Sequence, residues 1–279
     1  MHDVAHLTTT TRETPWDVLR VLAVVLQEWF DRPVANWLLR IVVAVALAGA
    51  AAMTYAAAWQ RWWPACPRGG FDSDACLRLQ SHEYDFQFPG DPWMPIGQAA
   101  ELYGGALLAL AVAAALLPTV LPPDRPRRHT GVGVRWRRFA TLVAVVPAVS
   151  LALLGVYTLR SGQAGELVSM PGVGLVFVVW CLAWPACLTA LAAAAPGVRP
   201  KRALPVAVLL GFATPIPAAL LFGPVFAGYV SYDTAPWTEA ASAPLLLAAA
   251  VAVLFVAPRS GQNAQPGFAT SLRTVRSPL

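Results

Sequence analysis

Charged side chains are absent from six long stretches of this chain, and this spacing constrains the fold more than any other feature. Only 13% of the 279 residues are charged, about half of the roughly 25% expected of an average soluble domain. A helix that crosses a bilayer needs about 20 consecutive apolar residues, and the shortest stretch has 19. The pattern predicts an all-α polytopic membrane protein with six transmembrane helices, in the stretches 41–60, 102–123, 139–159, 167–198, 203–232 and 240–258.

The alternative to a membrane protein is a soluble all-α protein whose core helices are unusually apolar. Surface helices of soluble proteins keep a polar stripe toward water. Neither residues 41–59 nor residues 142–156 show such a stripe. The sequence therefore favours the bilayer as the main surrounding of this chain.

Lysine and arginine predict the orientation, because they collect on the cytoplasmic side of short loops. Both termini are expected in the cytoplasm, and the net charge of +5 then reflects topology rather than a nucleic-acid partner. The outer side would hold only Arg61, Arg68, Arg78 and Arg160. The inner side would hold the other sixteen of the 20 basic residues, namely Arg12, Arg20, Arg32, Arg40, Arg125, Arg127, Arg128, Arg135, Arg137, Arg138, Arg199, Lys201, Arg202, Arg259, Arg273 and Arg276.

The ends of the chain differ from its apolar centre. Residues 14–31 begin with Thr14 as a helix cap and Pro15 at the first helical position, and they carry a polar stripe opposite an apolar face. This favours a helix lying on the inner membrane face, with packing against another protein domain as the alternative. The expected organisation is a disordered N-terminus without a signal peptide (1–14), an interfacial amphipathic helix (15–36), a transmembrane domain (37–257) with an outer loop (60–97) and cytoplasmic loops (122–138 and 197–202), and a disordered tail (258–279).

Four cysteines divide into two pairs with different expectations. Cys66 and Cys76 are the only cysteines on the predicted outer side, where an oxidising compartment favours a disulfide; the alternative is two free thiols. Cys181 and Cys187 lie six residues apart in the fourth predicted span, which turns them about 240° from one another around the helix. They are expected to be free packing residues.

The outer loop also carries the polar side chains that could form a site. His82, Glu83 and Asp85 lie close together, and Glu101 begins the second span; imidazole and carboxylate groups suit ligand binding or acid–base chemistry. These four residues are the candidate ligand-binding residues. The alternative is that His82, Glu83 and Asp85 are solvated loop side chains and that Glu101 lies at the depth of the lipid head groups. The triplet 72–74, Asp-Ser-Asp, predicts the start of a short helix; a metal-binding DxD is the other interpretation.

No sequence motif indicates a particular catalytic activity, so neither an enzyme nor a cofactor is expected. Nucleotide-binding, zinc-protease and serine-hydrolase signatures are missing, and no charged side chain lies near the middle of a predicted span. The fifth span contains Pro205, Pro215, Pro217 and Pro224, so a kink or break is expected there. Such breaks line binding sites in some transporters, although in ordinary bundles they only adjust packing.

Two functions remain open. The first is an accessory or binding component whose outer loop contacts a membrane or envelope partner. The second follows from a resemblance, since a surface helix followed by six spans is similar to permease subunits of ATP-binding-cassette exporters, and the resemblance implies an ATPase partner for the arginine-rich second loop. One lysine against 19 arginines indicates a GC-rich bacterial genome, and hence the cell membrane as the location.

Overall fold

A computed structural model of the chain describes residues 33–67, 70–120, 131–194, 200–222, 225 and 234–256. Within these ranges every regular element is a helix and no strand occurs. The expected N-terminus (1–14), most of the interfacial helix (15–32), part of the second loop (121–130) and the tail (257–279) lie outside the described residues. Residues 33–36 form the first turn of the first described helix.

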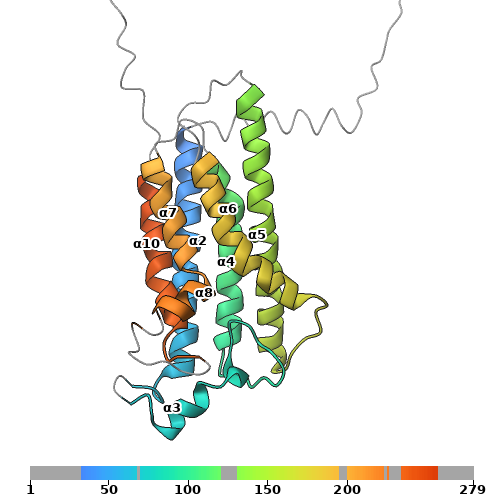
Figure 1. Ribbon diagram of the computed structural model, residues 1–279, viewed down its shortest axis with the longest axis vertical. Coiled ribbons are helices and arrows are strands. Elements are labelled where there is room, and N and C mark those ends of the chain that lie inside the picture. The colour runs from blue at the N-terminus through green and yellow to red at the C-terminus, as the bar shows by residue number, and fades with distance from the viewer. Residues whose placement is uncertain are drawn as a thin grey trace, which may run out of the picture.

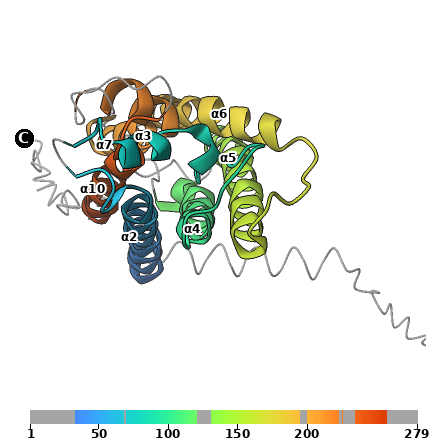
Figure 2. The ribbon, with the colours of Figure 1, turned by 90° about the horizontal axis from the view of Figure 1, so that it is seen from below.

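Six helices of the described part of the chain stand side by side as two rows of three (Figures 1 and 2). Each packs against the next along the chain and the last packs against the first, so the bundle closes into a ring. The chain direction alternates from one helix to the next, and the first of these helices begins at the same end of the bundle at which the last one ends (Figure 1). The helices are α2 (Pro33–Trp62), α4 (Ala99–Val120), α5 (Gly131–Ala164), α6 (Val173–Ala194), α7 (Pro200–Phe212) and α10 (Ser242–Phe255).

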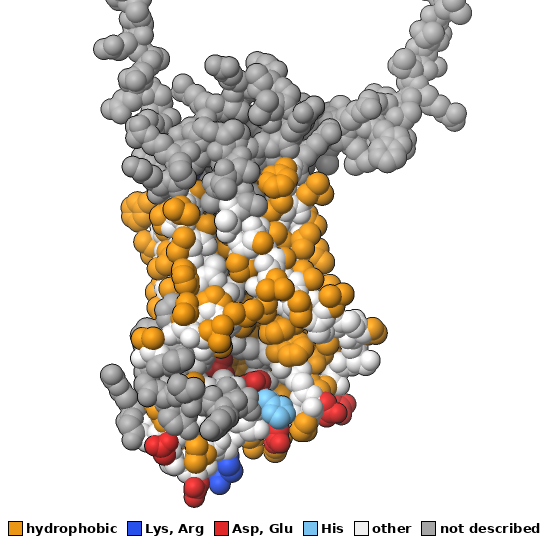
Figure 3. Space-filling view, in the orientation of Figure 1, with side chains coloured by type: hydrophobic (Ala, Val, Ile, Leu, Met, Phe, Trp, Pro, Cys, Tyr) orange, Lys and Arg blue, Asp and Glu red, His pale blue; other side chains and the backbone are white. Residues whose placement is uncertain are grey.

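The length and composition of the helices fit a membrane protein. Three helices are long and apolar enough to cross a bilayer, at Val34–Trp62, Ala99–Val120 and Phe139–Ala164. A fourth candidate is the pair Ala203–Phe212 and Pro215–Leu221, while Val173–Thr189 and Glu239–Phe255 are apolar but shorter. The side of the bundle seen in Figure 3 is mostly hydrophobic between its two ends. The described chain is therefore a helical bundle with three to four candidate membrane spans.

The predicted kink in the fifth apolar stretch is confirmed. The axis bends by 64° between α7 and α8 (Pro215–Pro217), which continues into the π-helical turn η2 (Ala218–Phe222). Proline provides no backbone N–H, so the carbonyl groups before it need other donors. The hydroxyl of Thr214 donates to the Gly211 carbonyl at 2.8 Å, and the indole of Trp184 donates to the Leu210 carbonyl at 3.2 Å.

Helices α4 and α5 approach so closely that glycine is required where they cross. A Cβ atom on Gly104 would lie 2.6 Å from the Leu159 nitrogen and 2.8 Å from the Gly155 oxygen. Small residues allow this kind of backbone approach in membrane bundles. This contact fixes the position of α4, and with it the end of the loop that precedes α4.

The buried face of α2 is a stripe with helical spacing. Val43, Leu47, Ala50 and Thr54 lie on it and are buried, as expected for residues three and four positions apart on one helix face. Buried arginines, Arg40 and Arg61, occupy the two ends of the same stripe. Helix α2 thus places a guanidinium group in the interior at each end of the bundle.

Candidate functional site

A polar structure closes one end of the ring. We call it the cap and define it as residues 63–67, 70–98 and 234–241; it contains α3 (Asp74–Leu79) and the short 3-10 helices η1 (His82–Tyr84) and η3 (Glu239–Ala241). The hydroxyl of Ser73 accepts a hydrogen bond from the Cys76 amide at 3.4 Å and so caps α3. The predicted helix start at 72–74 is confirmed.

The predicted disulfide between Cys66 and Cys76 is present, and both sulfur-bearing side chains are completely buried. It ties α3 to the segment that follows α2. The indole of Trp237 donates to the Cys66 carbonyl at 3.0 Å, and its ring meets Trp59 edge to face at 5.9 Å. Cys181 and Cys187 are free, as expected. The disulfide therefore joins two parts of the first loop to each other, and Trp237 joins that loop to the residues before α10.

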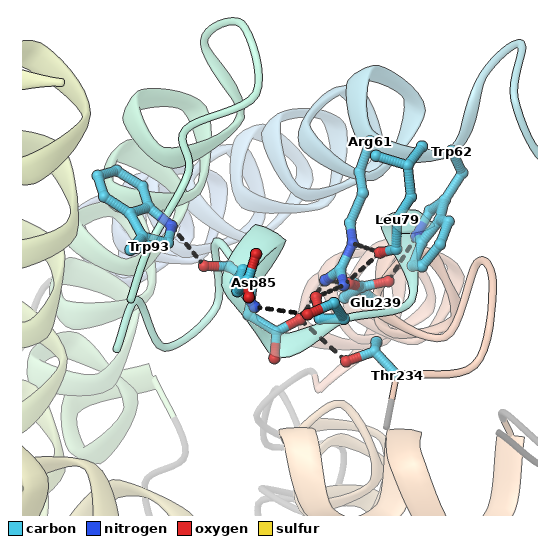
Figure 4. Close-up of polar contacts among 9 residues, drawn as sticks. Arg61, Trp62, Leu79, Asp85, Trp93, Thr234 and Glu239 are labelled. Carbon is cyan, nitrogen blue, oxygen red and sulfur yellow. Dashed lines mark hydrogen bonds and ion pairs between the residues drawn. The ribbon is translucent and has the colours of Figure 1, made fainter. Parts of the chain in front are cut away.

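An ion-pair network anchors the cap to the helix ends. The Arg61 guanidinium reaches the Glu239 carboxylate with an Nη1–Oε1 distance of 2.7 Å and also contacts the Asp85 carboxylate through Nη1. Figure 4 shows these groups converging from α2, the first loop and η3. We call the set Arg61, Trp62, Asp85, Thr234 and Glu239 the Arg61 network.

Each N–H group of Arg61 has an acceptor to match it. In addition to the two carboxylates, Nε and Nη2 donate to the Leu79 carbonyl at 3.0 and 2.8 Å, and Nη2 donates to the Ser81 carbonyl at 3.2 Å. A guanidinium has five N–H donors, and these contacts use all of them. The guanidinium also lies 4.4 Å from the centroid of the Trp62 ring, within the range of a cation–π contact.

The carboxylates of Asp85 and Glu239 share the single guanidinium of Arg61, and neutral donors provide their remaining hydrogen bonds. The Trp62 indole donates to Glu239 Oε2 at 2.7 Å, and the Thr234 hydroxyl donates to Asp85 Oδ1 at 2.9 Å. The Thr234 amide also donates to the Gln80 carbonyl at 3.1 Å. Residues near position 80 and residues near position 235 are thereby joined twice, through side chains and through backbone.

Burial makes the network energetically important. The side chains of Arg61 and Glu239 are 0% and 2% exposed, whereas that of Asp85 is 27% exposed. Removing one partner of a buried pair leaves an uncompensated charge and costs about 3 to 5 kcal/mol. The cap is therefore attached by an interaction that solvent screens weakly.

The four candidate ligand-binding residues have different surroundings. His82 is exposed on the cap surface, and Glu83 is half-buried with its carbonyl accepting from the Met94 amide at 2.6 Å. Asp85 belongs to the Arg61 network. Glu101 lies in the first turn of α4, where its Cγ and Cδ atoms are each 3.0 Å from the position of a Cβ on Gly162 in α5. Within the described ranges no group of three His, Cys, Asp or Glu side chains could hold a metal ion.

Arg61 and Glu239 are the residues that the sequence did not single out. The charge pattern predicts only that Arg61 lies on the outer side, and Glu239 lies in a stretch with no basic residue near it. The available signal was an ionisable residue at the end of an apolar stretch, which in membrane proteins indicates a partner in the interior. The identity of that partner, 178 residues away, is a property of the fold.

Comparison with known proteins provides no relative for this arrangement. No protein-family model matches the chain, and neither a curated protein nor a solved structure matches it significantly. The function must therefore be argued from the bundle and the cap themselves.

Proposed function

We propose that the protein crosses the cell membrane six times, with both termini in the cytoplasm and the cap outside, and that the cap binds a membrane or envelope partner. The observation that carries the binding role is the attachment of the cap, which the disulfide and the Arg61 network hold on the ends of α2 and α10. A surface that is already ordered loses less entropy on binding than a free loop.

The aromatic residues of α2 support the membrane position. Trp37 and Trp59 are 60% and 41% exposed, and a helix rises by about 1.5 Å per residue, which separates them by about 33 Å along the axis. This matches the hydrocarbon thickness of about 30 Å, at whose borders tryptophan is enriched. Trp63 stacks on Trp59 with centroids 4.9 Å apart, so the aromatic border on this side directly adjoins the cap.

The ring arrangement supports six crossings. The apolar stretches Val173–Thr189 of α6 and Glu239–Phe255, which contains α10, are shorter than the three long candidates, yet α6 and α10 each pack between neighbours of the same bundle. The described bundle begins and ends at one side (Figure 1), which requires an even number of crossings. Basic residues dominate the sequence on that side, which by the positive-inside rule is the cytoplasm.

The cap offers a mixed surface suited to a protein partner. Trp63, Leu77 and Met94 are exposed apolar side chains, and Asp72, Asp74 and Arg78 are exposed charged ones. Charged side chains gather around the cap end of the face seen in Figure 3. Apolar anchors within a charged rim are typical of protein interfaces.

Capture of partners from mild detergent tests the binding role. The variant His82→Ala with Glu83→Ala changes the cap surface and replaces none of the five residues of the Arg61 network, and Glu166→Gln changes an exposed carboxylate outside the cap. We expect a partner that copurifies with the wild type and the control and falls at least tenfold with the double variant. Equal recovery with all three proteins would contradict a site at these two residues.

A permease-like subunit is the second candidate, and the 64° bend between α7 and α8 favours it. Bent or broken spans move in transporters and line their substrate sites. The same capture experiment distinguishes the two functions, because a transport subunit would bring down an ATPase in stoichiometric amount. An envelope protein in its place would favour the accessory role.

A further inference from the structure

Helix α2 carries a second buried arginine whose surroundings differ from those of Arg61. Arg40 is 4% exposed and lies at the opposite end of the same buried stripe. Its Nε and Nη2 atoms are buried and have no hydrogen-bond partner among the residues that the structure describes. These two nitrogens form one edge of the guanidinium, and a parallel pair of N–H groups of this kind binds two oxygens of one phosphate or carboxylate.

No described carboxylate is available at that end of the bundle. The described acidic residues belong to the cap or to the helix ends and loop at the cap side; they are Asp72, Asp74, Glu83, Asp85, Asp91, Glu101, Glu166 and Glu239. A buried charge without a counter-ion is strongly unfavourable. Arg40 therefore requires an anion that the described part of the chain does not provide.

The depth of Arg40 indicates where that anion lies. Trp37, three residues earlier, is 60% exposed and marks the membrane border. The Cα of Arg40 is about 4.5 Å deeper along the axis, and helical side chains lean toward the N-terminus of their helix. The guanidinium can thus reach the level of the lipid head groups.

Asn36 adds a second polar group one turn before Arg40. Its Nδ2 donates to the Thr119 carbonyl of α4 at 3.4 Å, while its buried Oδ1 has no partner. The two unpartnered N–H donors of Arg40 and the unpartnered amide oxygen of Asn36 together suit a ligand that has both phosphate oxygens and a hydroxyl group. A phosphodiester with a hydroxylated head group has this chemistry.

We infer that Arg40 and Asn36 form a binding site for the phosphate of an anionic phospholipid with a hydroxylated head group, where α2 meets the end of α4. Arg40 binds two phosphate oxygens, and Asn36 Oδ1 accepts from the head-group hydroxyl. The inference rests on the membrane embedding proposed above and is independent of what the cap binds.

Thermal unfolding of the full-length protein in an uncharged detergent tests this site. We expect added phosphatidylglycerol to raise the Tm by at least about 2 °C more than phosphatidylcholine does, because a ligand of the folded state stabilises it. Arg40→Met should abolish the difference, and Arg40→Lys should retain part of it because it keeps the charge but not the paired donors. Arg160→Met, at an exposed position on α5, should retain all of it.

Three outcomes would overturn the inference. The first is an equal response of the wild type to both lipids, which decides the matter even if Arg40→Met does not fold. The second is an equal Tm rise with inorganic phosphate, which would make a soluble anion the ligand. The third is strong non-additivity between Arg40→Met and either Asp31→Asn or Asp124→Asn, which would show that a carboxylate of the chain itself occupies the site.

Discussion

Replacing Arg61 with methionine should lower the free energy of unfolding by about 3 to 5 kcal/mol. The substitution leaves Glu239, which is 2% exposed, with the Trp62 indole as its remaining side-chain partner. It also removes the donors to the Leu79 and Ser81 carbonyls. At roughly 2 to 4 °C per kcal/mol for a chain of about this size, the Tm should fall by roughly 6 to 20 °C.

The reasoning can be checked by thermal or denaturant unfolding in detergent with two further variants. Arg160→Met removes an exposed arginine and should change stability by less than about 0.5 kcal/mol. Arg61→Met combined with Glu239→Leu removes both buried charges, and apolar replacement of a whole buried pair is often nearly neutral. The double variant should therefore be more stable than Arg61→Met alone. If Arg61→Met stays within about 1 kcal/mol of the wild type, or if the second substitution only adds to the loss, the network does not hold the cap as described.

Two other variants, each compared with a control, test the packing of the cap and of the helices. Cys66→Ser with Cys76→Ser should reduce stability by about 2 to 3 kcal/mol, because the disulfide closes a short loop; an unfolding midpoint unchanged by reductant in the wild type would contradict this. Gly104→Ala should destabilise by at least about 1 kcal/mol, since its Cβ would meet the α5 backbone at 2.6 Å. Gly49→Ala is the matched control, with nothing within 4 Å of its Cβ, and it should be neutral or stabilising by up to about 1 kcal/mol; similar losses for both would refute the close-approach argument.

The elements that local patterns control could be predicted from the sequence. Apolar stretches without charge gave the helical, membrane-like character, proline spacing gave the bend after α7, and the Asp-Ser-Asp triplet gave the start of α3. Cys66 and Cys76 could be paired because no other cysteine shares their predicted side. Each of these inferences uses residues that are close in sequence or have few possible partners.

The network at the cap could not be predicted in this way. The sequence places Asp85 beside His82 and Glu83 as a neighbour along the chain, whereas in the fold it contacts Arg61 and Thr234. Glu239 had no distinguishing pattern, since its partner lies 178 residues earlier. Which residues meet at the end of a bundle depends on how the helices pack, and charge patterns along one segment do not contain that information.

Cysteine labelling in intact cells tests the topology on which the proposed function rests. Single cysteines would be placed by Glu166→Cys, at the exposed α5–α6 connection on the cap side, and by Thr130→Cys, in the second loop. Both would use a background with Cys181→Ala and Cys187→Ala, in which the Cys66–Cys76 disulfide remains. A membrane-impermeant maleimide should label Glu166→Cys in intact cells and Thr130→Cys only after the cells are opened. The reverse pattern would place the cap in the cytoplasm and contradict an outward-facing binding surface.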